Sequence, residues 1–213
     1  LDQLCMLMVN PATAQLLLTE FVDLKAGDWM IQSAANSAVG VYLVQLAKAR
    51  GVNVVSVVRR ESAVADLKAV GADVVIIDSP DLARDVKAAT GAKMKLAVDA
   101  VAGETAGRLA DTLERGGTLV NYGGMSNQPS ALGAGALIFN DIIVRGFWLV
   151  LWFEKATKEE RMGVYAALTA AVAKGELHAP IDKVFALDEI AEAARYSWAG
   201  GRSGKVLIAP NGI

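Results

Sequence analysis

Two adjacent arginines offer phosphate-binding chemistry at a specific place in the sequence. Arg59 and Arg60, with Glu61 after them, directly follow the apolar run VNVVSVV at 52–58. Guanidinium groups bind phosphate through paired hydrogen bonds and remain charged at every physiological pH. In sheets that bind dinucleotides, the residue after the second strand is usually an acid that contacts a ribose 2′-hydroxyl, so cations there favour a 2′-phosphate. A solvated arginine pair at the start of a helix is the alternative.

A second candidate is the small-residue stretch IQSAANSAVG at 31–40. Small side chains would let a pyrophosphate approach the backbone, and the amides that open the following helix would face the anion. Asn36 and Ser37 add side-chain donors, and Gly40 stands where a helix packs closely on a strand. Of the three glycines of the usual motif, one is present, so an ordinary small-residue helix start explains the stretch equally well.

Three further places could contact a ligand. The run NYGGMS at 121–126 allows a sharp turn against a cofactor ring, and a plain Gly-Gly turn explains it equally well. The aromatic stretch 147–149 (FWL) is more often core than cofactor site. Asp99, which ends LAVDAVAG, is expected to cap a helix that starts near Gly103 rather than to touch a ligand.

The composition excludes several functions. A formal net charge of −2 gives no basic field for nucleic acid, and one histidine (His178) with one cysteine (Cys5) cannot form a zinc cluster or a disulfide. The run GFWLVLWF at 146–153 is far shorter than the roughly 20 residues of a membrane span. Because the chain begins at Leu1 within a periodic apolar pattern, we expect it to be a fragment of a longer protein.

The elements that would position these loops alternate between strand and helix. We predict an α/β fold, a Rossmann-type doubly wound sheet of six parallel strands, with its ligand at the carboxyl ends of the strands. The predicted strands are 29–33, 52–58, 74–77, 96–99, 118–122 and 142–147. The predicted helices are 39–50, 62–70, 81–90, 105–114 and a shorter one at 131–139.

Glycines predict where the helices end. Gly51, Gly71, Gly91 and Gly116 each stand after a predicted helix, where a left-handed backbone is easiest for glycine. Before the sheet we predict a helix at 11–22 capped by Asn10, and after it helices at 158–174 and 188–198 with strands at 181–185 and 205–209. The segment GGRSG at 200–204 is predicted to be an ordinary loop.

With these loops placed, the chain resembles the medium-chain dehydrogenase/reductase superfamily, and within it the NADPH-dependent trans-2-enoyl-thioester reductases of fatty acid synthesis. The resemblance covers almost the whole chain. It rests on VNPATA at 9–14, AANSAVG at 34–40, VVRR at 57–60, RGGTLVNYGGMS at 115–126, RGFWL at 145–149 and SGKVLI at 203–208.

The resemblance implies an NADP(H) site, with the diphosphate at 36–39, the ribose phosphate at 59–61 and the nicotinamide half near 122–125 and 147–149. The implied cofactor contacts are Asn10, Asn36, Ser37, Ala38, Val39, Arg59, Arg60, Glu61, Tyr122, Gly123, Gly124, Met125, Phe147, Trp148, Leu149 and Lys205. Two residues depart from the family pattern. Ala38 replaces a more usual glycine, and Arg60 stands where an acid is often found.

The resemblance further implies an activity and a domain plan. Residues 1–150 would form the NADP-binding domain, and 151–213 would partly belong to a GroES-like catalytic domain that precedes this region in the family. The family's tyrosine acid lies in that domain, so we predict no catalytic residue here, no metal, and little activity of this chain alone. The intact enzyme would reduce 2-enoyl thioesters, and would lie in the cytoplasm or, in a eukaryote, in mitochondria.

The sequence also predicts how the chain associates and leaves two other functions open. The run GFWLVLWF resembles an edge strand, so we expect a homodimer through residues 142–150 and no membrane partner. A quinone or alkenal reductase of the same superfamily is one rival. A Rossmann module without redox chemistry, which binds S-adenosylmethionine or senses nucleotides, is another, although a methyltransferase site generally has an acid where Arg59 and Arg60 stand.

Overall fold

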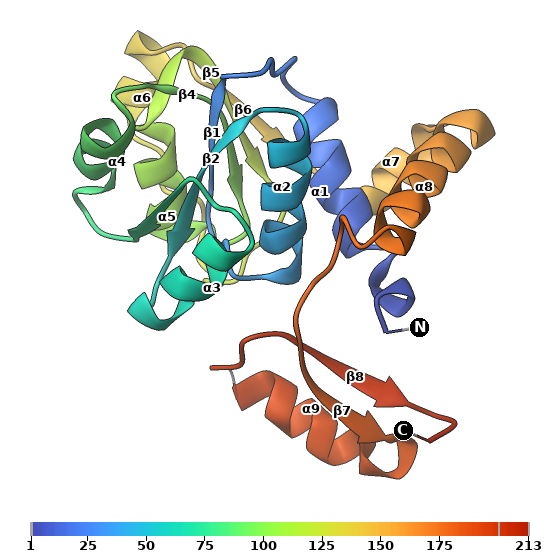
Figure 1. Ribbon diagram of the computed structural model, residues 1–213. Coiled ribbons are helices and arrows are strands. Elements are labelled where there is room, and N and C mark those ends of the chain that lie inside the picture. Colours follow the sequence, from blue (N-terminus) through green and yellow to red (C-terminus); the bar gives the residue numbers. More distant parts are fainter. Residues whose placement is uncertain (1, 200, 213) are drawn as a thin grey trace.

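The computed structural model describes residues 2–199 and 201–212, and their centre is a parallel sheet (Figure 1). The described residues form a six-stranded sheet in the order β3-β2-β1-β4-β5-β6, with every neighbouring pair parallel. The chain order reverses between β1 and β4, which is the switch point where ligands of such sheets bind. The predicted Rossmann-type sheet is therefore confirmed.

The elements follow one another along the chain in strict alternation through the sheet. The strands are β1 (Trp29–Gln32), β2 (Asn53–Val58), β3 (Val74–Ile77), β4 (Met94–Asp99), β5 (Leu113–Asn121), β6 (Ile143–Gly146), β7 (Ile181–Ala186) and β8 (Lys205–Ala209). The α-helices are α1 (Asn10–Thr19), α2 (Ala38–Ala49), α3 (Val64–Ala69), α4 (Leu82–Thr90), α5 (Gly103–Ala110), α6 (Ala134–Phe139), α7 (Leu149–Lys155), α8 (Lys158–Ala173) and α9 (Ile190–Ala199). Short 3-10 helices are η1 (Leu4–Met6), η2 (Glu61–Ala63) and η3 (Leu187–Glu189).

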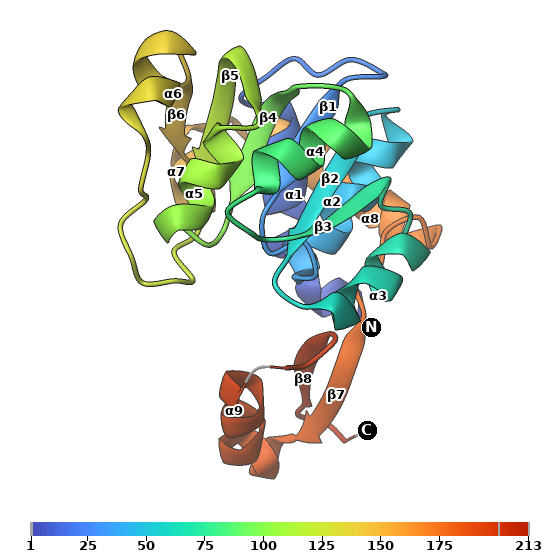
Figure 2. The same ribbon diagram turned by 90° about the vertical axis from the view of Figure 1, so that its left-hand side faces the viewer.

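Alternating strand residues bury opposite faces of the sheet. Met30 points into the core beneath α1 and α2, whereas the next residue, Ile31, belongs to the core beneath α4 and α5. Both are 0% exposed, because helices cover both faces (Figure 2). This arrangement explains why VNVVSVV is a continuous apolar run rather than an alternating one.

Most predicted helix ends are confirmed, and one is wrong. Gly51, Gly71 and Gly91 follow α2, α3 and α4 with positive φ angles. Gly116 also has a positive φ of 77°, but it lies inside β5, because α5 already ends at Ala110. β5 begins earlier than predicted, and its pairing register with β4 shifts between Met94 and Leu96. The left-handed backbone of Gly116 therefore belongs to an irregularity in this strand and does not end a helix.

The first long helix is shorter than predicted and begins differently. α1 starts at Asn10 itself, and Val9 occupies the capping position without a side-chain hydrogen bond. Asn10 is therefore not the cap. Pro11 supplies the preset φ angle at the start of the helix, and the helix ends at Thr19 rather than at Val22.

The apolar run GFWLVLWF does not form one edge strand. β6 ends at Gly146, and residues from Leu149 form helix α7. Leu149 and the half-buried Trp152 and Phe153 pack against the core that includes α1, so helical packing wins over the strand propensity of this run. The edge strand at this end of the sheet is the four-residue β6, all of whose residues are exposed.

The C-terminal segment forms a separate small unit below the main sheet (Figure 1). The strands predicted at 181–185 and 205–209 are present as β7 and β8, which pair in parallel, and α9 packs on them. Amide side chains hold the segment that leads into this unit. Gln45 exchanges two 3.0 Å hydrogen bonds with the backbone of His178, and Gln3 does the same with Ala179 at 2.9 and 3.0 Å. Within the described residues, none of the helices has the length and apolar content required to cross a membrane.

Candidate functional site

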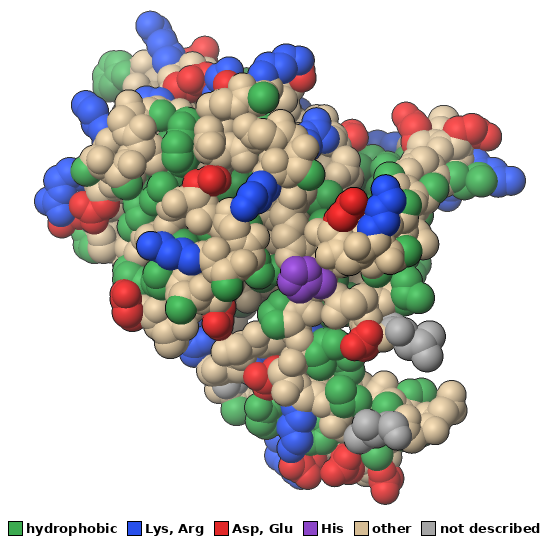
Figure 3. Space-filling model, in the orientation of Figure 1, with side chains coloured by type: hydrophobic (Ala, Val, Ile, Leu, Met, Phe, Trp, Pro, Cys, Tyr) green, Lys and Arg blue, Asp and Glu red, His purple; other side chains and the backbone are tan. Residues whose placement is uncertain are grey.

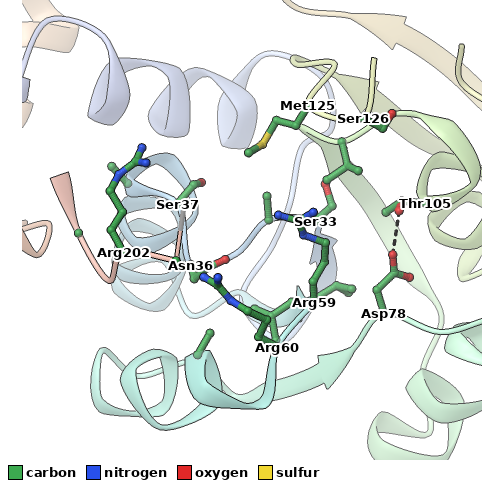
Figure 4. A pocket seen from close by; sticks show the side chains of 18 of the residues that line it. Ser33, Asn36, Ser37, Arg59, Arg60, Asp78, Thr105, Met125, Ser126 and Arg202 are labelled. Carbon is green, nitrogen blue, oxygen red and sulfur yellow. Dashed lines mark hydrogen bonds between the residues drawn. The ribbon is translucent and has the colours of Figure 1, made fainter. Parts of the chain in front are cut away.

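A cleft of about 300 Å³ opens at the carboxyl ends of the central strands (Figure 4). Its wall combines the segments that follow β1, β2, β3, β4 and β5 with the loop that precedes β8. The predicted residues that line it are Asn36, Ser37, Ala38, Arg59, Arg60, Met125 and Lys205. Residues brought together from such distant parts of the chain indicate a binding site at the switch point of the sheet.

The loop after β1 brings backbone close to the cleft. The side chain of Ser37 caps α2 by accepting a hydrogen bond from the Gly40 amide at 3.2 Å. A Cβ on Gly40 would lie 2.3 Å from the carbonyl oxygen of Ala35, so this glycine is required for the close approach. Ala34 has a φ of 46°, a conformation that costs a non-glycine residue energy and is concentrated at functional sites. The start of α2 therefore faces the cleft, as an anion-binding helix end does.

Cations dominate the charged side chains of the cleft. Arg59 and Arg60 follow β2 directly and are exposed, and Arg202 and Lys205 approach from the C-terminal segment. Among the described residues, none of these four forms a salt bridge with a carboxylate. Burial, and next the positive charge of Arg202, lowers the pKa of Lys205. The cleft is thus a local positive site on a chain with a net charge of −2.

The carboxylate that lines the cleft, Asp78, is already occupied. Arg108 donates to it from Nε and Nη2, both at 2.8 Å, and Thr105 Oγ1 donates to the same carboxylate at 2.8 Å. This bidentate pair is the strong form of such contacts. Figure 4 shows the Asp78–Thr105 hydrogen bond, and among the described residues the salt bridge of Asp78 is with Arg108 and not with Arg59 or Arg60.

A buried carboxylate fixes the floor of the cleft. Asp99 is 0% exposed and accepts hydrogen bonds from Ser33 Oγ (2.6 Å), the amides of Val101 and Ala102 (both 2.9 Å) and Asn121 Nδ2 (3.2 Å). These bonds join the ends of β1, β4 and β5 and cap the turn before α5. Asp99 was predicted to cap the helix that starts near Gly103, and this is wrong: Ala102 is the N-cap residue of α5 and no side chain caps it, whereas Asp99 accepts from the two amides before the helix.

Tyr122 is an orphaned polar group beside this floor. Its hydroxyl is buried and has no hydrogen-bond partner among the described residues, although it lies near Ser37. Burial raises the pKa of Tyr122, and the charge of Asp99 raises it further. The phenol therefore stays protonated and can donate to a ligand oxygen.

The aromatic residues of the predicted site line a different cavity. Phe147 and Trp148 belong to a hollow of about 450 Å³ formed with α1, α7 and α8. Phe147 packs edge-on against Phe21 with ring centroids 5.9 Å apart. The remaining predicted residues do not line the cleft in the described part of the chain: Asn10, Val39, Glu61, Tyr122, Gly123, Gly124 and Leu149. Their cofactor contacts stay predictions.

Sequence reasoning missed several residues of the cleft wall. Asp78 and Thr105 could have been found, because Asp78 directly follows β3 and the carboxyl ends of parallel strands lie on one edge. Arg202 could not, since its approach depends on how the C-terminal unit folds back toward the sheet. The segment 200–204, predicted to be an ordinary loop, contributes Gly201, Arg202 and Gly204 to the wall.

Comparison with known proteins identifies the family. Residues 38–163 match the family described as zinc-binding dehydrogenase. The chain belongs to this family. It is a member of the medium-chain dehydrogenase/reductase superfamily, in the branch of the enoyl thioester reductases, as the sequence motifs predicted.

Relatives of this family member support that branch. A mitochondrial enoyl-[acyl-carrier-protein] reductase of Dictyostelium discoideum is 38% identical, and the match covers 97% of this chain and 61% of that protein. The complex of Etr1p with NADP and crotonyl-CoA is 30% identical, with a TM-score of 0.85, covering 93% of this chain and 60% of the other. The Etr1p/Etr2p heterodimer of Candida tropicalis, also 30% identical with the same coverage, has a TM-score of 0.84. The chain thus spans about three fifths of the length of these proteins.

The name of the family implies zinc, and the residues of this member do not fit a zinc site. The described residues contain no group of three or more His, Cys, Asp or Glu side chains that could hold a metal ion. The sequence has one histidine and one cysteine.

Proposed function

We propose that this chain is the NADPH-binding portion of an enzyme that reduces 2-enoyl thioesters. One observation supports this most strongly: Arg59 and Arg60 line the cleft at the start of α2, and neither forms a salt bridge with a carboxylate of the described residues. The donor set fits the coenzyme, because the amides at the start of α2 match its diphosphate and the guanidiniums match its 2′-phosphate. The relatives are named as enoyl reductases, and the Etr1p complex contains NADP and crotonyl-CoA.

The residues of this chain would act by binding and orientation. Ser37, Asn36 and the first amides of α2 would hold the diphosphate, and Arg59 and Arg60 the ribose phosphate. Asp99 would keep the strand ends in place without contact to the coenzyme. When bound, NADPH supplies the hydride for the β-carbon of the enoyl thioester. No catalytic residue is proposed within this chain, and by itself it would bind coenzyme and reduce little.

Coenzyme preference tests the proposal directly. Replacement of both arginines (Arg59→Ala with Arg60→Ala) should weaken NADPH binding about ten- to a hundredfold, since a charge-assisted hydrogen bond contributes about 1.5 to 3 kcal/mol. NADH binding should stay unchanged. Arg50→Ala, an exposed arginine at the end of α2 outside the cleft, is the matched control. Isothermal titration calorimetry measures the binding of both coenzymes to the native chain and to each variant, and equal affinity of the native chain for both coenzymes would refute the proposal.

Substrate choice distinguishes this function from its rivals. The intact protein should reduce crotonyl-CoA in preference to quinones with NADPH as reductant, whereas a quinone reductase would show the opposite preference. A nucleotide-binding module without redox chemistry would bind NADPH and reduce neither.

Since the relatives are named mitochondrial, we propose the mitochondrion as the compartment in a eukaryote and the cytoplasm otherwise.

We also propose a homodimer through the edge strand β6. All of its residues are exposed, with Ile143 at 50% and Val144 at 41%, and Phe139 on the preceding α6 is 75% exposed. An unpaired apolar edge is a template for pairing with a second chain. Val144→Lys should give monomers in sedimentation velocity, whereas Met162→Lys on the exposed side of α8 should leave the dimer intact. A monomeric native chain would contradict this proposal.

A further inference from the structure

The C-terminal unit reaches back to the arginines of the nucleotide site. Arg202 lies in the loop between α9 and β8, and it lines the same cleft as Arg59 and Arg60 although more than 140 residues separate them in sequence. A Cβ on the neighbouring Gly201 would lie 3.8 Å from Nη1 of Arg60, so this loop is in contact range of the Arg60 guanidinium. In Figure 4, Arg60 lies between Arg59 and Arg202.

The position of Arg202 is fixed from its own unit. Its Nη1 donates to the carbonyl oxygen of Ser197 near the end of α9, and the side chain is half-buried. A guanidinium has five N–H donors in a planar fork, so this contact orients the group and leaves donors for a second acceptor.

One carboxylate, Asp182, lies near Arg202 without forming a salt bridge with it in the described part of the chain. The described part of the chain gives Arg202 no salt bridge with a carboxylate. Asp182, close enough for Arg202 to contribute to the lowering of its pKa, is held by the Tyr196 hydroxyl at 2.6 Å and the Ser203 amide at 3.2 Å. Three guanidiniums and the half-buried Lys205 facing one cleft repel one another unless an anion lies between them.

We propose that Arg202 is a third guanidinium of the ribose 2′-phosphate site, so that the phosphate bridges the sheet domain and the C-terminal unit. This inference rests on the proposed function and extends it. Arg59 and Arg60 would bind the phosphate from the sheet side, and Arg202 from the α9–β8 loop. Phosphorylated coenzyme would then fix the C-terminal unit in place, whereas the unphosphorylated coenzyme would not.

Two small probes test the bridge without any catalysis. Adenosine 2′,5′-bisphosphate carries the ribose phosphate, and 5′-ADP lacks it. In calorimetry with the whole chain, Arg202→Ala should weaken binding of the bisphosphate about tenfold, as expected for loss of a charge-assisted bond, and leave 5′-ADP unchanged. Arg202→Lys should lose less. Arg195→Ala, an exposed arginine on α9 outside the cleft, should bind both probes as the native chain does.

A second readout covers the case in which Arg202→Ala fails to fold. In the native chain, hydrogen exchange of the backbone at 201–205 should slow with the bisphosphate and not with 5′-ADP. Unchanged bisphosphate binding by Arg202→Ala, or an equal loss for both probes, overturns the bridge while Arg59 and Arg60 keep their role. If the native chain does not prefer the bisphosphate, the proposed coenzyme preference itself fails, and the bridge fails with it.

Discussion

The sheet domain and the C-terminal unit differ in how completely they bury their apolar side chains. In the sheet domain Leu17, Tyr42 and Leu43 are 0% exposed, whereas in the C-terminal unit Trp198 is 93% and Ile190 56% exposed. Figure 3 shows the C-terminal unit as a lobe below the main body, with acidic and basic side chains close together at its lower edge. The first region has a core closed by helices on both faces, and the second leaves several large side chains exposed, Trp198 most of all. Packing of this unit on a GroES-like domain stays a prediction.

The largest loss of stability should follow removal of the buried Asp99 carboxylate beneath the cleft. Asp99→Ala would leave the buried donors of Ser33, Val101, Ala102 and Asn121 without their acceptor. Because buried donors lose water as well as their partner, the sheet domain should lose about 3 to 5 kcal/mol of unfolding free energy in urea. Asp81→Ala, which removes an exposed ion pair with Arg84, should cost less than about 1 kcal/mol. Similar losses in both variants would show that the Asp99 network contributes little to stability.

A core substitution in the C-terminal unit should act only locally. Phe185 is 0% exposed, packs 5.7 Å from the Tyr196 ring and has Lys183 Nζ 4.3 Å above its own ring. Phe185→Ala should destabilise this unit by about 3 kcal/mol, since a buried aromatic fills the largest part of so small a core. Hydrogen exchange should rise sharply at 181–209 and stay slow in β1 and β4.

The control for this local effect is Leu187→Ala, because Leu187 is 52% exposed. It should leave hydrogen exchange in both regions near the native level. If Phe185→Ala instead lowers protection in β1 and β4, the two regions unfold as one cooperative body, and the distinction between them is wrong.

The sheet domain was also the more predictable region, for a physical reason. Its strands are apolar on both sides and its helices alternate with them, so the order and the strand ends at Val58 and Ile77 followed from local pattern. The errors arose where tertiary packing decides. Leu149 begins a helix because its side chain and its neighbours find a core beside α1, and no local signal in GFWLVLWF shows that.

The residues of the candidate site also differ in how far the sequence predicts them. Asn36 and Arg59 were predictable because they directly follow strands whose ends meet at the switch point of the sheet. Arg202 was missed, because a loop that reaches back from a separate unit leaves no periodic pattern in the sequence. Asp78 was predictable on the same ground as Arg59, because it directly follows β3, but its pairing with Arg108 depends on the tertiary fold.

Helix α8 lies between the sheet domain and the C-terminal unit in sequence. A substitution in its cap shows with which of the two regions it unfolds. Thr157 caps it, with Oγ1 accepting from the Glu160 amide at 3.1 Å while Glu160 accepts from the Thr157 amide at 2.7 Å. Thr157→Ala should cost about 1 kcal/mol, as loss of a capping side chain usually does. Because Leu168 on α8 packs into the core beside α1, we expect the loss in the unfolding of the sheet domain. Thr169→Ala, which removes an exposed hydroxyl in the middle of α8, is the control. If Thr157→Ala lowers the hydrogen-exchange protection of residues 181–209 and not that of the sheet domain, α8 belongs with the C-terminal unit.

The smallest expected effect is the response of that capping box to acid. Hydrogen bonds from the Thr157 amide, and next from its hydroxyl, lower the pKa of Glu160 below its ordinary value of 4.5. A carboxyl group with a lowered folded-state pKa stabilises the fold above its unfolded pKa, and that contribution is lost as the pH falls through the folded value. The protection factors of the amides at the start of α8 should therefore fall below pH 4.5, while those of the strands of the sheet stay high. Glu160→Gln keeps an acceptor at this position and should remove the acid response, whereas Glu159→Gln, one residue away and outside the box, should retain it. A native chain whose α8 exchange is flat across this pH range would show that the box does not hold the helix start. The boundary between the two regions would then rest on the Leu168 packing alone.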